Sequence, residues 1–270
     1  MTKDGNTPMG PFNDIVVEKT GYVALVEIRR PPHNYFDVAL IREIATAFEA
    51  LDADAGCRAL VLAAQGKSFC AGANFGGDDR DGGELLSGPR PGAAHLYLEG
   101  NRLFRTGKPI VAAVHGAAVG GGLGLAMVAD FRVTCAEARF CANFTRLGFH
   151  PGFGLTVTLP AVIGPTRAAL MFYTSRRLRG DEAHALGLAD LLVPQDQVRA
   201  AALSLAAEIA ENSPLGVMAT RATLRGDLAD RVRAATEHEL AEQTRLRRTD
   251  DFKEGVKAMA ERRVPVFTSR

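Results

Sequence analysis

The sequence contains no tryptophan and only four cysteines, and it has almost no excess of either charge. Its 32 basic and 31 acidic side chains nearly cancel, so we expect neither a nucleic acid nor another polyanion as a partner. The cysteines follow no metal-binding spacing such as C-x2-C, which favours reduced, buried thiols, no metal site and a cytoplasmic location. They are Cys57, Cys70, Cys135 and Cys141.

Signals for export or for a membrane span are also not expected. The first residues, MTKDGNTPMG, are polar and contain no apolar core of the kind a signal peptide needs. Residues 110–129 carry no charge, and Gly116, Gly120 and Gly124 repeat the spacing of paired membrane helices. Because most of this run is Gly, Ala and Val, its apolar area is small. We therefore predict a buried strand, a glycine turn and a buried helix there, and no membrane association.

Several nucleotide and hydrolase motifs fail on their spacing. The stretch Gln65–Ser68 ends like a phosphate-binding P-loop, but Val61 occupies the position of the required first glycine. The glycines after Val119 do not fit G-x-G-x-x-G, because Met127 replaces the last one. No G-x-S-x-G serine elbow is present. A P-loop enzyme, a dinucleotide-binding enzyme and a serine hydrolase of that type are not predicted.

Periodicity predicts an α/β chain that ends in helices. A hairpin is expected around Thr20-Gly21, Asp37 has the character of a helix N-cap, and residues 95–106 read as a helix. Buried strands are expected at 59–63, 109–114 and 131–135. From residue 196 the pattern is helical, with breaks at Ser213-Pro214, Gly226-Asp227 and Thr249-Asp250. We predict an α/β core over residues 12–195 and an α-helical C-terminal subdomain over 196–270.

One arrangement occurs twice: a buried strand, a turn rich in Gly and Ala, and then a helix. It is found in ALVLAAQGKSFCAGAN and again in IVAAVHGAAVGGGLGLAM. Such a turn presents free N–H groups at the start of a helix, where they can bind a phosphate or the oxyanion of an acyl group. Since the phosphate motifs fail, two turns that converge on an oxyanion remain.

These segments resemble the crotonase (enoyl-CoA hydratase/isomerase) superfamily over nearly the whole chain, from about residue 15 to 267. The resemblance rests on SFCAGANF, KPIVAAVHGAAVGGGLGLAMVADFRV, DEAHALGLADLLVP and DFKEGVKAMAERRVPVF, in that order. It implies a crotonase-like fold of repeated ββα units with a helical C-terminal part that trimerises, as a homotrimer or a dimer of trimers. It also implies an acyl-CoA or enoyl-CoA ligand, with no cofactor besides the coenzyme A of the substrate.

The resemblance further implies which backbone groups meet the thioester. The oxyanion hole maps to the N–H groups of Ala73 and Gly121, and Gly120 and Gly122 give the ligand room to approach. The pantetheine path maps to Ala71, Gly72, Ala73, Asn74 and Phe75. For the CoA phosphates, Arg30, His33 and Lys67 are candidates, although each also reads as an ordinary surface charge, as do Arg262 and Arg263.

The sequence departs from the family at both glutamates that transfer protons in its hydratases. By the family's spacing these positions are Gly124 and Phe144. General acid–base catalysis contributes roughly 10²–10⁴-fold per group, so we expect little standard hydration. A phenylalanine and a glycine there suggest a drier pocket with room for a bulky acyl group, or a base that comes from elsewhere.

His150 is the candidate base, because a histidine titrates near neutral pH and the turn that carries it borders the acyl pocket in the family. The alternative is a histidine that satisfies loop backbone groups. The carboxylates of a predicted mobile loop over residues 76–92, Asp78, Asp79 and Asp81, read mainly as solvated surface. His115 reads as a support for its turn, and His95, Tyr97 and Glu99 as solvent-facing or packing residues.

Three functions remain open from the sequence. The first is an enzyme, a lyase or isomerase, that stabilises a thioester enolate without the two glutamates, for example a decarboxylase or a C–C hydrolase. The second is a non-catalytic acyl-CoA binding protein on the same fold. The third is a weak hydratase in which another group replaces the glutamates.

Overall fold

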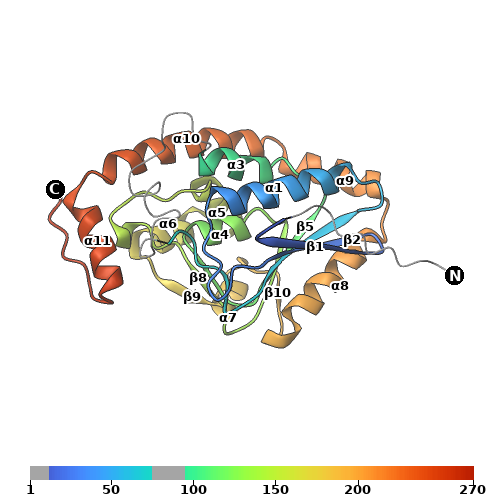
Figure 1. The fold of residues 1–270 in the computed structure, drawn as a ribbon, viewed down its shortest axis with the longest axis horizontal. Helices are drawn as coiled ribbons and strands as arrows, with labels where there is room; N and C mark the ends of the chain where they lie inside the picture. The colour runs from blue at the N-terminus through green and yellow to red at the C-terminus, as the bar shows by residue number, and fades with distance from the viewer. Residues whose placement is uncertain (1–11, 75–94) are drawn as a thin grey trace.

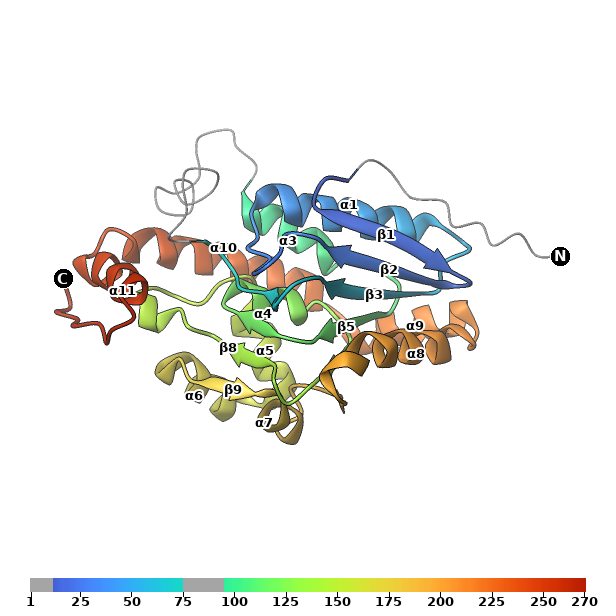
Figure 2. The ribbon, with the colours of Figure 1, turned by 60° about the horizontal axis from the view of Figure 1, so that its bottom comes forward.

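Two sheets and a set of covering helices build the molecule, whose structure is a computed structural model that describes residues 12–74 and 95–270 (Figure 1). The larger sheet has the order β1-β2-β3-β5-β7-β10. Its strands are β1 (Ile15–Thr20), β2 (Val23–Ile28), β3 (Ala59–Ala64), β5 (Ile110–Val114), β7 (Phe131–Thr134) and β10 (Leu191–Leu192). The β1–β2 pair is the predicted antiparallel hairpin, and the remaining pairs are parallel. Figure 2 shows β1, β2, β3 and β5 side by side in this order.

The smaller sheet is made of strands too short for the sequence pattern to reveal. Its order is β4-β6-β8-β9. The strands are β4 (Ser68–Cys70), β6 (Ala117–Val119), β8 (Arg139–Cys141) and β9 (Arg177–Arg179). The strands β3, β5 and β7 of the larger sheet are each followed by a strand of the smaller sheet and then by a helix, as in β5-β6-α4. The structure thus has the repeated ββα units and the α/β class that we predict.

The helices enclose both sheets. Those of the core are α1 (Val38–Ala53), α3 (Leu96–Leu103), α4 (Gly121–Ala126), α5 (Leu155–Ile163), α6 (Pro165–Thr174) and α7 (Gly180–Ala185), with 3-10 turns at Thr145–Leu147 and Gln195–Gln197. Asp37 caps α1 as predicted, because its side chain accepts the N–H of Leu40 at 2.7 Å. Asp52 near the end of α1 accepts the N–H of Gly107, at 2.6 Å, and so ties the approach to β5.

The C-terminal helices begin and break where the sequence predicts. They are α8 (Val198–Ala210), α9 (Pro214–Arg225), α10 (Leu228–Leu246) and α11 (Asp250–Ala260). They do not stand apart from the core, because α8 packs on β3, β5 and β7, and α10 packs on α3 and α5. Figure 1 shows α1 and α8 on opposite sides of the larger sheet. The boundary after residue 195 therefore marks a change in secondary structure within one packed body.

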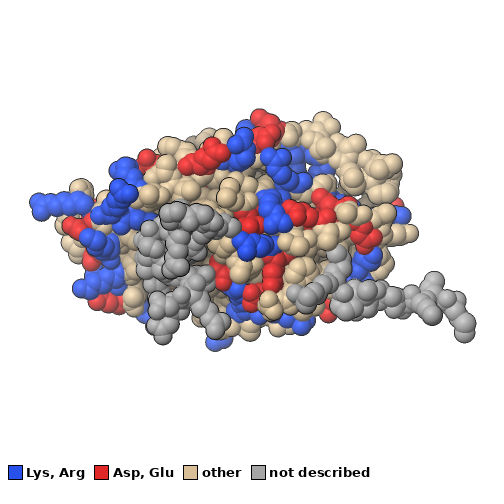
Figure 3. All heavy atoms as spheres, turned by 45° about the horizontal axis from the view of Figure 1, so that its top comes forward, with Lys and Arg blue, Asp and Glu red and all other residues tan. Residues whose placement is uncertain are grey.

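Surface charges of both signs are mixed on the face shown in Figure 3. Ion pairs join neighbouring elements there and elsewhere; Arg102 on α3, for example, lies 2.6 Å from Glu49 on α1. Among the described residues, none of the helices is both long and apolar enough to cross a bilayer. The uncharged run 110–129 is divided between β5, β6 and α4, which agrees with the predicted strand, turn and helix.

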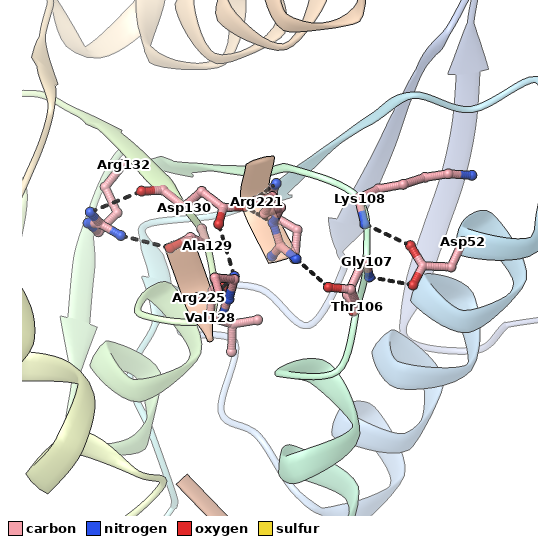
Figure 4. A network of polar contacts seen from close by, with 11 residues as sticks. Asp52, Thr106, Gly107, Lys108, Val128, Ala129, Asp130, Arg132, Arg221 and Arg225 are labelled. Atoms are coloured by element: carbon pink, nitrogen blue, oxygen red, sulfur yellow. Dashed lines mark hydrogen bonds and ion pairs between the residues drawn. The ribbon is translucent and has the colours of Figure 1, made fainter. Parts of the chain in front are cut away.

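A buried polar cluster fastens α9 to the larger sheet (Figure 4). Asp130 is its centre: it accepts the backbone N–H of Ile110 at 2.8 Å, Nε of Arg221 at 2.8 Å and Nη1 of Arg225 at 3.0 Å. Arg132, also buried, donates to the carbonyl of Ala129 at 2.9 Å. These bonds give each of the three arginines a carboxylate or carbonyl partner, and they fix the helical part of the chain against β5 and β7.

Candidate active site

The two glycine-rich turns lie directly against each other. Gly72, after β4, has a φ of +79°, a backbone conformation that side-chain-bearing residues rarely adopt. A Cβ on Gly72 would lie 2.6 Å from the carbonyl oxygen of Val119 and 3.6 Å from the nitrogen of Gly121. The turn after β4 therefore passes next to the start of α4, and only a residue without a side chain fits between them.

Ala73 and Gly121 both line the wall of one cavity. Gly121 is the first residue of α4, so its N–H has no carbonyl one turn earlier to bind. Within the described part of the chain, neither of the two N–H groups donates a hydrogen bond. Two free donors at adjacent turns can bind an oxyanion, and burial strengthens that interaction.

The cavity behind these donors has a volume of about 370 Å³ and is mainly apolar and aromatic in its lining. Apolar side chains in the wall include Phe36, Leu96, Leu147, Phe149, Phe153 and Val256. Phe144, at the second glutamate position, also lines it and packs edge-on against Phe149 with ring centroids 5.6 Å apart. The polar side chains in the wall are Tyr35, Asn74, Tyr97, Asn143, Arg177, Gln243 and Arg247, and Asp and Glu are not among the described residues of the lining.

Asn34 fixes the first turn, a role that the sequence analysis missed. Its buried amide donates to the carbonyls of Gln65 and Ser68, at 2.6 and 2.7 Å. Two backbone bonds continue this contact: Phe36 donates to Gly72 at 3.0 Å, and Ala71 donates to His33 at 3.0 Å. The segment around Asn34 therefore positions the turn that carries Ala73.

The predicted contact of the His33 side chain with a CoA phosphate stays a prediction. Its ring is exposed, lies 3.5 Å from the hydroxyl of Ser68, and is not part of the cavity wall. Arg30 does not face the cavity either, because it pairs with Asp14 and Asp37, at 2.5 Å each. His33 contributes through its carbonyl, which holds Ala71.

The space that we predict at Gly124 is filled by the protein itself. A Cβ on Gly124 would lie 2.8 Å from both Cβ and Cδ1 of Phe153, so the ring of Phe153 packs directly on the glycine. Phe153 is 2% exposed and has a φ of +62°. Gly124 is therefore a packing position behind the cavity wall, and it does not enlarge the pocket for a bulky acyl group.

Some of the other residues that we predict to contact the ligand line the cavity, and others do not. Ala71, Gly72, Asn74 and Gly120 line the cavity. Gly122 does not, because it packs on β4, where a Cβ would lie 2.0 Å from the carbonyl oxygen of Cys70. Phe75 and the carboxylates Asp78, Asp79 and Asp81 lie outside the described residues.

His150, the predicted base, is not among the residues that line the cavity around Ala73 and Gly121. Its Nδ1 is 2.8 Å from the carbonyl oxygen of Pro151, and its ring packs edge-on against His238 with centroids 5.7 Å apart. This ring lines a separate hollow with Thr156 and Tyr173. His150 thus fits the alternative reading, a histidine that satisfies loop backbone. His115 likewise supports its turn, with Nε2 3.0 Å from the carbonyl of Gly66.

Three polar side chains from two distant parts of the chain, α3 and α10, form a further part of the cavity wall. The hydroxyl of Tyr97 on α3 donates to Oε1 of Gln243 on α10 at 2.8 Å, and Nε2 of Gln243 donates to the carbonyl of His150 at 2.9 Å. Nη2 of Arg247, one turn further along α10, donates to the same Gln243 oxygen at 3.3 Å. Tyr97 was predicted only as a surface or packing residue, since 146 positions separate it from Gln243.

Burial and the charge of Arg247 set the protonation states of this group. Burial raises the pKa of the Tyr97 hydroxyl, and the negative charge of Glu239 raises it further. Burial lowers the pKa of His95 to about 4, and the nearby charge of Arg247 lowers it further. At neutral pH, Tyr97 is therefore a protonated donor and His95 is neutral, with Nδ1 free to accept the N–H of Tyr97 at 3.1 Å.

Comparisons with a family profile, with relatives and with a solved structure all identify the enoyl-CoA hydratase/isomerase family. The sequence profile described as enoyl-CoA hydratase/isomerase matches residues 18–270. The crotonyl-CoA hydratase of Syntrophomonas wolfei is 31% identical over 265 residues, which cover 96% of this chain and 99% of the relative. The short-chain-enoyl-CoA hydratase of Clostridium acetobutylicum is 30% identical, with 93% and 96% covered. A crystal structure of an enoyl-CoA hydratase/isomerase from Pseudoalteromonas atlantica superposes with a TM-score of 0.85 at 26% identity, covering 95% of this chain and all of that one (100%).

Proposed function

Since the chain belongs to the enoyl-CoA hydratase/isomerase family, we propose that it acts on an acyl-CoA whose thioester oxygen binds between the N–H groups of Ala73 and Gly121. The observation that carries this proposal is the meeting of two free backbone donors in one largely apolar cavity. Such donors bind an enolate oxygen more strongly than a neutral carbonyl, because the negative charge develops where they point. Loss of one donor of this kind typically costs about 3–4 kcal/mol of transition-state stabilisation.

The proposed chemistry does not use a pair of glutamates. Gly124 and Phe144 stand at the two positions, and Phe153 fills the volume beside Gly124. We therefore favour a lyase reaction that generates its own enolate, as in decarboxylation or C–C cleavage. In a decarboxylation, the bond from Cα to the carboxylate carbon breaks and CO2 leaves. The electron pair of that bond moves into the thioester to give the enolate, and a proton from solvent then forms a new Cα–H bond.

A non-catalytic acyl-CoA binding protein is the second candidate. It is favoured by one observation: the described lining contains no histidine or carboxylate, and burial raises the pKa of Tyr97, its buried tyrosine. The oxyanion donors would then serve only to hold the thioester carbonyl.

We also propose a cytoplasmic homotrimer or a dimer of trimers, as the family resemblance implies. Large apolar side chains support an association surface outside the cavity: Leu215 and Leu224 on α9 are 76% and 82% exposed, and Tyr173 on α6 is 80% exposed. Light scattering on the purified protein tests the oligomeric state directly.

Calorimetric binding of saturated acyl-CoAs, together with turnover assays on a thioester panel, separates the candidates. Binding of an acyl-CoA with turnover of a malonyl-type or β-keto thioester supports the proposed lyase. Binding without turnover on the panel supports the second candidate. Hydration of crotonyl-CoA at ordinary hydratase rates would contradict the interpretation of Gly124 and Phe144.

A further inference from the structure

Arg247 is a cationic side chain in the cavity wall whose charge no carboxylate balances within the described part of the chain. Its guanidinium lines the cavity together with Gln243 and Tyr97. Its one side-chain hydrogen bond among the described residues goes to the amide oxygen of Gln243, at 3.3 Å, and its Nε is buried without a partner there. Removing a charge from water without a counter-charge is unfavourable, and burial accordingly lowers the pKa of Arg247.

Three largely buried arginines elsewhere in the chain, unlike Arg247, each pair with a carboxylate. Arg132 lies 3.2 Å from Asp190, while Arg221 and Arg225 share Asp130 at 2.8 and 3.0 Å. Each of these therefore has a counter-charge within the protein, and Arg221 and Arg225 tie α9 to the sheet. Arg247 makes no such structural ion pair within residues 12–74 and 95–270.

The carboxylate on the same face of α10 is already engaged. Glu239 lies two turns before Arg247, and it accepts the N–H of Gly154 at 2.8 Å and the hydroxyl of Thr156 at 2.6 Å. Gln243, between them, is neutral and also accepts the hydroxyl of Tyr97. Arg247 consequently brings an unbalanced charge to the wall of a cavity whose only other described cation is the exposed Arg177.

We propose that the acyl group of the ligand carries its own carboxylate, which pairs with Arg247, so that the ligand is the CoA monothioester of a dicarboxylic acid. This inference rests on the proposed acyl-CoA function. A carboxylate is the group that a guanidinium binds with two parallel hydrogen bonds, and the desolvated surroundings strengthen the pair. The thioester is then held at Ala73 and Gly121, and the far end of the acyl chain at Arg247.

The test compares ligands of equal chain length by calorimetry: succinyl-, glutaryl- and adipyl-CoA against butyryl-, pentanoyl- and hexanoyl-CoA. We expect the best dicarboxylic thioester to bind about 30-fold or more tightly than its monocarboxylic partner, as for other buried charge pairs. In Arg247→Met this advantage should vanish, while the monocarboxylic affinity changes by no more than about 3-fold. Arg245→Met is the matched control, because Arg245 lies on the same helix, exposed and paired with Glu242.

Two further measurements exclude other roles for Arg247. Free CoA should bind the wild type and Arg247→Met equally; a weaker Kd for CoA in the variant would assign Arg247 to a phosphate and overturn the proposal. Thermal unfolding of the free variant should occur no earlier than that of the wild type, because an unpaired buried charge is removed. Equal binding of the two ligand series by the wild type would also overturn the inference and leave the proposed function standing, whereas failure of every acyl-CoA to bind would refute both.

Discussion

Replacing Gly124 by alanine tests whether Phe153 occupies the space of the missing first glutamate. The new Cβ would lie 2.8 Å from two Phe153 atoms, closer than packed side chains allow, so the ring or α4 must shift. Overpacking of this kind costs about 1–3 kcal/mol. Alanine regains about 1 kcal/mol over glycine in a helix. We therefore expect the variant to lose about 1 kcal/mol of unfolding free energy.

The same substitution should become stabilising once the ring is removed. In a Phe153→Gly background, the methyl group added at position 124 meets no atom of the former side chain, and glycine also suits the φ of +62° at position 153. Only the helix preference of alanine then remains, so we expect Gly124→Ala to add about 1 kcal/mol in this background. The difference between the two backgrounds is a coupling free energy of about 2 kcal/mol, within the range for residues in direct contact.

Urea unfolding of the four proteins at one protein concentration measures this coupling, since association also contributes to stability. Gly216→Ala is the control: Gly216 is an exposed helix residue on α9, and a Cβ there has only ordinary contacts at 3.5 Å, so alanine should stabilise. If Gly124→Ala stabilised the wild type as much as Gly216→Ala does, or if the coupling were near zero, Phe153 would not fill this space.

Substitutions at His95, Asn34 and Gly121 test the supports of the site. His95 is neutral in the folded protein with its pKa lowered to about 4, while the unfolded chain takes up the proton near pH 6.5, so stability is lost as the pH falls between these values. His95→Asn keeps a capping side chain, and its urea midpoint should fall less between pH 7 and pH 4.5 than that of the wild type. Asn34→Asp should lower the melting temperature more than Asn34→Ala, because a carboxylate would face two carbonyl oxygens that now accept from the amide. Gly121→Ala should weaken acyl-CoA binding at least 10-fold by calorimetry, because its Cβ would lie 2.1 Å from Cζ of Phe36, and Phe36→Ala in the same chain should restore part of the affinity.

The features that the sequence predicts correctly depend on local signals. The β1–β2 hairpin follows from alternation around Thr20-Gly21, and the cap of α1 from the position of Asp37. The helix breaks before α9 and α11 coincide with Ser213 and Thr249, whose side chains accept the N–H groups of Gly216 and Phe252. Each of these signals needs only neighbouring residues.

The features that the sequence does not reveal depend on contacts between distant segments. The strands of the smaller sheet are three residues long, too short for a period to be recognised. The family's spacing predicts the glutamate positions at Gly124 and Phe144, but the ring that packs on Gly124 comes from residue 153. Neither Asn34 nor Arg247 belongs to a sequence motif. Asn34 matters because its amide donates to backbone carbonyls of a distant segment. Arg247 matters because no carboxylate pairs with it among the described residues.

One face of α10 links these observations. Glu239, Gln243 and Arg247 are four residues apart and so share that face. Glu239 holds the start of α5, and Gln243 holds the carbonyl of His150, so together they fix both ends of the turn that places Phe153 on Gly124. A glutamate at position 124 would therefore need a different turn and a different α10 face as well. The packing of these three segments leaves no room for a longer side chain at position 124, and we expect that Gly124→Glu alone produces no hydration of crotonyl-CoA.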